Sequence, residues 1–158
     1  MDKRTEYFHR VASQRIPTEG RIVVWTHGQC FQGPTGEGGC GAVFEESGVV
    51  SEFSGVVFET NNHKAEVESI AMGLERSRLS AKLIIRSSSQ VCILTALRVY
   101  KWPSCDVLWD RISVLIGAIE QNGGSVDFEW WAKGIGGAHQ ERAVTLSKGA
   151  KSLQGDVF

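Results

Sequence analysis

The feature of this sequence that most constrains its fold is a change in the spacing of its apolar residues close to Asn62. Before this point, short apolar runs are separated by turns rich in glycine, and the first of these turns covers residues 28–39. Three runs so close together predict three strands joined as an antiparallel meander. The runs span residues 21–26, 41–44 and 48–58.

Beyond Asn62 the apolar residues recur at three- and four-residue steps, which is typical of an amphipathic helix. Val67 and Leu74 lie on this apolar stripe, and we expect a helix over residues 62–79 that Asn61 or Asn62 caps. Strand-like and helix-like segments then alternate to the end of the chain. We expect further strands at 82–86 and 126–131, and helices at 90–100, 106–121 and 140–153.

This order of elements predicts an α/β fold with a five-stranded mixed sheet. The meander supplies the antiparallel strands, and helical crossovers reach the parallel strands and cover both faces of the sheet. A chain of 158 residues with 42% hydrophobic residues is sufficient for one core. We therefore expect a polar lead-in over residues 1–20 and a single domain over residues 21–153.

Composition excludes several classes of protein. The net charge of −1 argues against a strongly basic nucleic-acid binder, although it leaves local patches open. The four cysteines show neither CxxC spacing nor a histidine cluster, so we expect free thiols and no zinc site. No apolar run is long enough to span a membrane, and the polar N-terminus lacks the centre of a secretory signal. We expect an intracellular protein, cytoplasmic or nuclear, without a cofactor.

Five motifs, in this order and on these expected elements, resemble those of the ribonuclease H family over about residues 21–150. They are Trp25-Thr-His-Gly-Gln-Cys30, Gly38-Gly-Cys-Gly-Ala-Val-Phe44, Thr60-Asn-Asn-His-Lys-Ala-Glu66, Ile85-Arg-Ser-Ser-Ser-Gln90 and Trp131-Ala-Lys-Gly134. The resemblance implies a ribonuclease H-like fold. In active members of that family, four carboxylates converge on two divalent ions, and a mobile histidine assists turnover.

This chain departs from the family pattern at most of those positions. Glu66 matches the family's glutamate. The two aspartate positions on the strands hold His27 and Ser88, the histidine position holds Ile135, and the last aspartate position holds Val144. The resemblance therefore implies a degenerate site in which no residue is catalytic and no metal is bound.

The physical reason for this expectation is charge. Two divalent ions about 4 Å apart repel each other strongly, and several carboxylates must offset that repulsion. Glu66 alone cannot do so, and the imidazole of His27 suits softer metals than magnesium. His27 is then either a turn residue or a partner of Glu66. Glu66 either hydrogen-bonds His27 between sheet and helix or is a solvated helix residue.

Polar residues beside these positions remain candidates for contacts to a nucleic-acid backbone. They are Thr60, Asn61, Asn62, Arg86 and Gln90. The chain from Arg76 to Lys101 carries bases and no acid, which favours phosphate binding unless these bases form only a solvated surface. The stretch from Glu37 to Glu68 is acidic and argues the other way.

Three hypotheses about function follow. The first is a ribonuclease H-like pseudoenzyme that acts as a protein-interaction or scaffolding module, with a protein partner or self-association, for example in a nucleic-acid-processing complex. The alternative is a non-cleaving binder of RNA–DNA hybrid or double-stranded RNA. The third is a nuclease with an altered single-metal site at His27 and Glu66.

Overall fold

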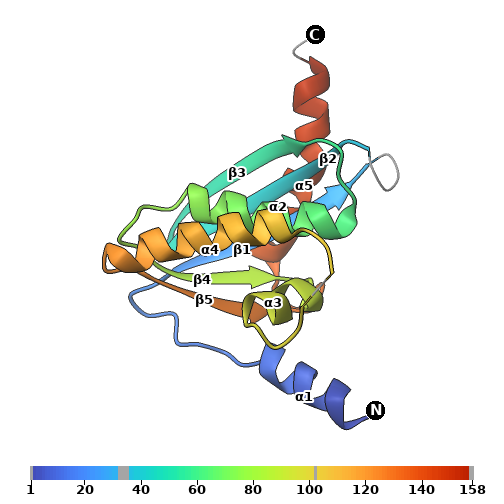
Figure 1. Ribbon diagram of the computed structural model, residues 1–158. Coiled ribbons are helices and arrows are strands. Elements are labelled where there is room, and N and C mark those ends of the chain that lie inside the picture. The colour runs from blue at the N-terminus through green and yellow to red at the C-terminus, as the bar shows by residue number, and fades with distance from the viewer. Residues whose placement is uncertain (1, 32–35, 102, 157–158) are drawn as a thin grey trace.

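The computed structural model describes residues 2–31, 36–101 and 103–156, and it confirms the expected fold class. Five strands form one mixed sheet in the order β3-β2-β1-β4-β5, with helices on both faces (Figure 1). The strands are β1 (Ile22–Cys30), β2 (Gly38–Glu46), β3 (Val49–Val57), β4 (Lys82–Ser87) and β5 (Ser125–Trp130). The helices are α1 (Lys3–Ala12), α2 (Asn62–Glu75), α3 (Gln90–Ala96), α4 (Asp106–Gln121) and α5 (Ala138–Asp156).

Strand β1 is the centre of the sheet. It pairs with β2 in an antiparallel ladder and with β4 in a parallel one, where Thr26 lies opposite Ser87. Because side chains alternate between the faces of a strand, Val24 enters the larger core, and Val23 and Trp25 enter the smaller one. The sheet therefore has two apolar faces, and both need a cover of helices.

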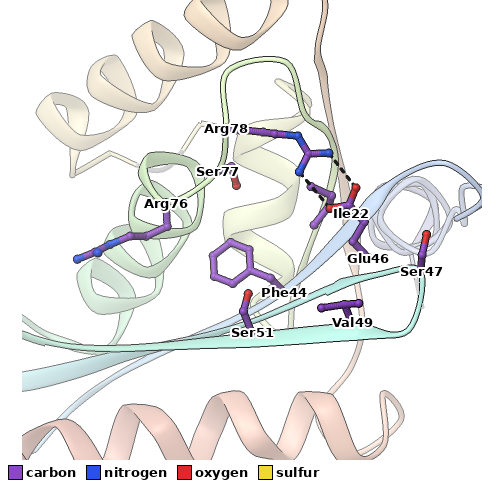
Figure 2. A pocket seen from close by; sticks show the side chains of 9 residues that line it. All are labelled: Ile22, Phe44, Glu46, Ser47, Val49, Ser51, Arg76, Ser77 and Arg78. Atoms are coloured by element: carbon purple, nitrogen blue, oxygen red, sulfur yellow. Dashed lines mark hydrogen bonds and ion pairs between the residues drawn. The ribbon is translucent and has the colours of Figure 1, made fainter.

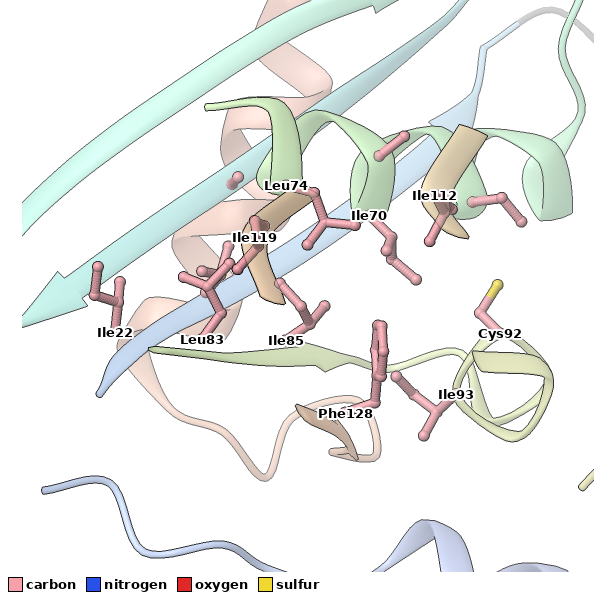
Figure 3. Close-up of a cluster of buried hydrophobic side chains, with 14 of the residues drawn as sticks. Ile22, Ile70, Leu74, Leu83, Ile85, Cys92, Ile93, Ile112, Ile119 and Phe128 are labelled. Atoms are coloured by element: carbon pink, nitrogen blue, oxygen red, sulfur yellow. The ribbon is translucent and has the colours of Figure 1, made fainter. Parts of the chain in front are cut away.

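The larger core lies between the sheet and helices α2 and α4 (Figure 3). Ile70 and Leu74 of α2 and Ile112 and Ile119 of α4 are almost fully buried there. Helix α2 begins where it was expected, since the Asn61 side chain accepts a hydrogen bond from the Lys64 N–H at 2.9 Å. This cap fixes the end of α2 that carries Glu66.

Helix α5 covers the opposite face of the sheet. It approaches β2 closely because β2 carries glycine there: a Cβ on Gly41 would lie 2.3 Å from the carbonyl oxygen of Ala143. Gly28 allows a similar approach on the other face, where a Cβ would lie 2.0 Å from the carbonyl oxygen of Ala65. The glycines of β1 and β2 thus bring α2 and α5 down onto the sheet.

Several boundaries differ from the sequence-based expectation. The predicted turn over residues 28–39 is largely strand, since β1 continues to Cys30 and β2 begins at Gly38; residues 32–35 of that turn lie outside the described part of the chain. Helix α2 ends at Glu75 and α3 at Ala96, both earlier than expected. The polar lead-in contains helix α1, whose side packs on α3. No helix among the described residues is long and apolar enough to cross a membrane.

Candidate functional site

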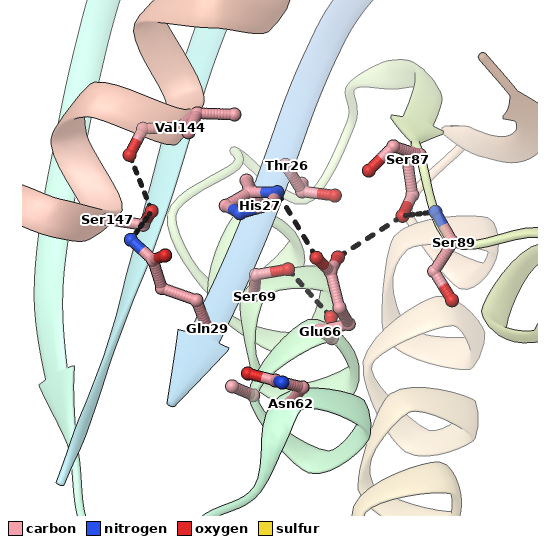
Figure 4. A network of polar contacts seen from close by, with 12 residues as sticks. Thr26, His27, Gln29, Asn62, Glu66, Ser69, Ser87, Ser89, Val144 and Ser147 are labelled. Atoms are coloured by element: carbon pink, nitrogen blue, oxygen red, sulfur yellow. Dashed lines mark hydrogen bonds and ion pairs between the residues drawn. The ribbon is translucent and has the colours of Figure 1, made fainter. Parts of the chain in front are cut away.

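The polar residues of the family motifs meet at one edge of the sheet. Strands β1 and β4 run parallel, so their carboxyl ends reach the same edge, and the first turns of α2 lie over it. Figure 4 shows Glu66 of α2 directed between His27 of β1 and Ser87 of β4. We call this edge, with Thr26–Cys30, Thr60–Glu66 and Ser87–Gln90, the carboxyl edge.

Glu66 is the central group of the carboxyl edge and is only 8% exposed. One carboxylate oxygen lies 3.2 Å from the Nδ1 atom of His27, and the other accepts a hydrogen bond from the Ser87 hydroxyl at 3.4 Å. Burial raises the pKa of Glu66 to about 8, although hydrogen bonds from the Gly28 N–H and the Ser87 hydroxyl act against this rise. The acid form of Glu66 therefore predominates at neutral pH.

The pKa of His27 is shifted in the opposite direction. Burial, together with the positive charges of Lys133 and Lys148, lowers it to about 4. Between pH about 4 and about 8, the His27–Glu66 pair consequently holds one proton. A raised pKa for Glu66 and a lowered pKa for His27 both fit a neutral carboxylic acid whose O–H donates a hydrogen bond to a neutral imidazole. The hydrogen bond between them satisfies two buried polar groups.

The side chains of the carboxyl edge do not fit a pair of magnesium ions. Glu66 favours its protonated form, and its oxygens are already engaged by Ser87, Gly28 and His27. In the described ranges no group of three or more His, Cys, Asp or Glu side chains is placed to hold a metal. Hard divalent ions need several ionised oxygen ligands, so we assign no step to a metal here.

The polar shoulder beside Glu66 is built by the loop before α2. The Asn62 side-chain oxygen accepts the Cys30 N–H at 2.8 Å and so ties the end of β1 to the start of α2. Asn61 and Asn62 are exposed, whereas Thr60 is fully buried and its hydroxyl donates to the Asn61 carbonyl. The two asparagines can meet a ligand, and Thr60 positions them.

The structure does not bring Arg86 to this edge. Arg86 and Ser87 are neighbours on β4, so their side chains leave opposite faces of the sheet. Arg86 lies over the rings of Trp25 and Trp131 and donates to the Glu129 carboxylate at 2.8 Å. Gln90, at the start of α3, is half-buried and stays at the carboxyl edge.

The remaining motif positions are spread around Glu66. Val144 lies on α5 across β1 from Glu66 (Figure 4), and Ile135 is exposed in the loop before α5. Ser87, which the sequence analysis did not single out, is the serine that reaches Glu66, and Ser88 instead accepts the Trp130 indole N–H through its carbonyl oxygen. Strand alternation would have identified Ser87, because Leu83 and Ile85 on the same strand are buried in the larger core and Ser87 is the next residue on that face.

A pocket of about 570 Å³ lies at the opposite end of the sheet, where β1 begins and α2 ends (Figure 2). Arg78 closes one side of it through two hydrogen bonds to the Glu46 carboxylate, at 2.8 and 3.0 Å. Its lining includes Arg76 and, from the family motifs, Phe44, which is apolar. No polar residue of the family motifs therefore lines this pocket.

Curated proteins similar to this chain are ribonucleases H. Ribonuclease H of Blochmanniella floridana is 26% identical over 144 residues, which are 82% of this chain and 83% of that protein. Ribonuclease H of Nitratidesulfovibrio vulgaris is 26% identical over 148 residues, which are 85% of this chain and 91% of that protein. No sequence model of a known protein family matches the chain.

Solved structures of ribonucleases H share the fold. LC11-RNase H1 in complex with an RNA/DNA hybrid has a TM-score of 0.68 at 22% identity, over 84% of this chain and 99% of that one. The N-terminal RNase H domain of Rv2228c from Mycobacterium tuberculosis has a TM-score of 0.69 at 19% identity, over 88% of this chain and 99% of that one. The resemblance inferred from the motifs is confirmed.

Two expectations are corrected by these relatives. The motif positions predicted a pseudoenzyme that works as an interaction module, and therefore a chain that is not an enzyme. Both predictions are contradicted, because the curated relatives are named for an enzyme, which suggests a nuclease. None of the relatives shows that a member with these residues is inactive. A protein partner, self-association and an intracellular location stay predictions.

Proposed function

We propose that this chain, a member of the ribonuclease H family, binds the backbone of an RNA–DNA hybrid along its carboxyl edge. The observation that carries the proposal is that the family's polar shoulder, Asn61 and Asn62, survives in place beside Glu66 at the end of β1. Relatives over most of the chain carry the ribonuclease H name, and one structure with this fold is a complex with an RNA/DNA hybrid.

The chemistry of the carboxyl edge suits a phosphate backbone. Asn62 uses its side-chain oxygen for the Cys30 N–H, which leaves the amide N–H groups directed outward as donors. The charges of Lys133 and Lys148 are close enough to His27 to lower its pKa, so positive potential reaches the same edge. Such donors and charges contact phosphate and sugar oxygens without reading bases, which suits a duplex recognised by its shape.

Hydrolysis of the hybrid's RNA strand is the activity that the relatives' name suggests. The residues of this chain can bind and orient the duplex, and the His27–Glu66 pair can hold one exchangeable proton on the Glu66 carboxyl, hydrogen-bonded to the Nδ1 atom of His27. We derive no step through a divalent ion, since the donor set does not fit two of them. Cleavage is therefore measured together with binding, with and without magnesium or manganese.

Asn62→Asp is the sharpest test, because aspartate keeps the acceptor for the Cys30 N–H but replaces the outward donor with negative charge. We expect hybrid affinity, measured by fluorescence anisotropy at low salt, to fall by about fivefold or more. The matched control is Gln121→Glu, which makes the same charge change on an exposed residue at the far end of α4 and leaves the affinity unchanged. No binding of the hybrid by the unmodified chain at low salt would overturn the proposal.

A further inference from the structure

Helix α1 lies outside the stretch that resembles the family, yet it is held firmly against the domain. Its Ala12 is buried, and Phe8 meets the ring of Tyr100 edge-on at 6.0 Å between centroids. The chain after the helix is fixed as well, because Arg15 donates to the Trp130 carbonyl at 2.7 Å and the Ile16 N–H donates to the buried Glu129. Helix α1 thus has one defined position on the domain.

The outer side of α1 carries two bases and one acid. Phe8 and Ala12 are directed toward the domain, so Lys3, Tyr7 and Arg10, at steps of four and three residues, share the exposed side. The guanidinium of Arg10 lies 5.7 Å from the centre of the Tyr7 ring, which orients it. Glu6, three residues from Lys3 and four from Arg10, shares this side and is the one acid among the ten residues of α1, against Lys3, Arg4 and Arg10.

The neighbouring surface carries two further bases, beside the exposed acids Asp106 and Asp110. Helix α1 packs on α3, and the segment that leaves α3 presents Arg98 and Lys101, both exposed. The other arginines of the run from Arg76 to Lys101 are engaged: Arg78 pairs with Glu46, Arg86 with Glu129, and Arg76 lies over Phe53. Across the described ranges, no salt bridge engages Lys3, Arg10, Arg98 or Lys101.

Helix α1 also lies at the same end of the molecule as the carboxyl edge. In Figure 1, the start of α2, then α3 and then α1 follow one another along the side toward which β1 and β4 run. A duplex that lies on Asn61 and Asn62 and continues along this side would pass over α3 and α1. Exposed cations in that position gain most from displacing the counterions of phosphates.

We propose that Lys3 and Arg10 of α1, with Arg98 and Lys101 beside α3, form a second contact surface for the phosphate backbone of the same duplex. This inference rests on the proposed function and extends its site beyond the residues of the family resemblance. The surface adds affinity that is independent of base sequence and strongly dependent on salt.

The test compares double variants by the salt dependence of their affinity for one labelled RNA–DNA hybrid. K3Q/R10Q removes two charges from α1, and R76Q/K82Q removes two exposed charges at the opposite end of the sheet. We expect K3Q/R10Q to lower the slope of log affinity against log salt by about 2, and R76Q/K82Q to leave it unchanged. The charge-conserving K3R/R10K retains the slope of the unmodified chain.

Each outcome decides between the two proposals. If the unmodified chain binds the hybrid and Asn62→Asp weakens binding, but K3Q/R10Q binds as the unmodified chain does, the second surface is refuted and the proposed function stands. An equal loss in K3Q/R10Q and R76Q/K82Q also refutes it, because net charge alone then explains binding. If the unmodified chain binds no hybrid at low salt, the proposed function fails, and this inference fails with it.

Discussion

Glu66 and Glu129 are both buried, and the sheet separates them. Glu129 is fully buried and is surrounded by strong donors: the Arg86 guanidinium at 2.8 Å, the Trp131 indole N–H at 2.9 Å and the Ile16 N–H. Glu66 has no arginine and meets the imidazole of His27, the Ser87 hydroxyl and a backbone N–H. A carboxylate with a full set of donors stabilises the fold, whereas one without a cation stays available to exchange a proton.

The basic residues also differ in the partners that they have. Arg86 is mostly buried and pairs with Glu129, and the exposed Arg15 donates to the Trp130 carbonyl and lies over the Trp131 ring. Lys133 and Lys148, whose charges reach His27, and Lys3 and Arg10 of α1 are exposed and make no salt bridge among the described residues. Contacts within the domain, rather than the number of charges, therefore distinguish structural cations from those that can meet a ligand.

The largest effect is expected from Glu129→Ala. It leaves the Arg86 guanidinium, whose side chain is 11% exposed, without its partner, and it removes the acceptor of the Trp131 and Ile16 N–H groups. We expect a loss of about 3–5 kcal/mol in the free energy of unfolding, measured with urea. Glu129→Gln keeps one acceptor oxygen, so its loss in the free energy of unfolding should be smaller. A loss below about 1 kcal/mol for Glu129→Ala would mean that the cluster is not structural.

The second effect is a pH dependence that belongs to Glu66. Its pKa is about 8 in the folded chain and near 4.5 when unfolded, so its contribution to stability is present at low pH and is lost as pH rises toward 8. The pKa of His27 is about 4 in the folded chain and 6.5 when unfolded, so its contribution to stability increases as pH rises from about 4 to 6.5 and offsets the loss from Glu66 there. The net loss therefore falls between pH 6.5 and 8 and amounts to about 2 kcal/mol.

Glu66→Gln isolates this effect, because glutamine keeps an acceptor for the Gly28 N–H but does not titrate. Urea unfolding at pH 6.5 and pH 8 should show the decline in the unmodified chain and not in the variant. An equal decline in both proteins would show that Glu66 is already ionised at neutral pH.

The smallest effect is expected from Ser87→Ala. The Ser87 hydroxyl lowers the pKa of Glu66 by donating to it, so its removal should move the pH-dependent loss of stability to higher pH. At pH 6 the free energy of unfolding should change by less than about 1 kcal/mol. Ser88→Ala is the control, since the structure gives the Ser88 side chain no contact with Glu66. A larger shift from Ser88→Ala would reverse the assignment.

Much of the fold could be predicted from periodicity. The change of apolar spacing at Asn62 marks the transition from meander to helix, and the alternating segments beyond it follow the expected order. Helix α1 was missed because its apolar contacts, through Phe8 and Ala12, are few and depend on residues distant in the sequence, such as Tyr100. The spacing of apolar residues within a short segment says little about whether that segment packs on a distant part of the chain.

The sequence predicted which residues belong to the site but not the directions of their side chains. A contact between Glu66 and His27 was one of two alternatives, and the structure places the two side chains 3.2 Å apart. The direction of Arg86 could have been inferred from strand alternation, but its partner Glu129 could not, because that pairing depends on the register of β4 against β5. The exposure of Asn62 and the burial of Thr60 likewise depend on the tertiary fold of the loop.

The central claim is that a hybrid duplex lies along the carboxyl edge and not elsewhere on the domain. Mapping of backbone amide NMR shifts during titration with an RNA–DNA hybrid tests this most directly. The account predicts the largest changes at residues 26–30, 60–66, 87–90 and in α1, with the pocket residues Glu46, Arg76 and Arg78 unaffected. Changes centred on that pocket, or no changes at low salt, would contradict it.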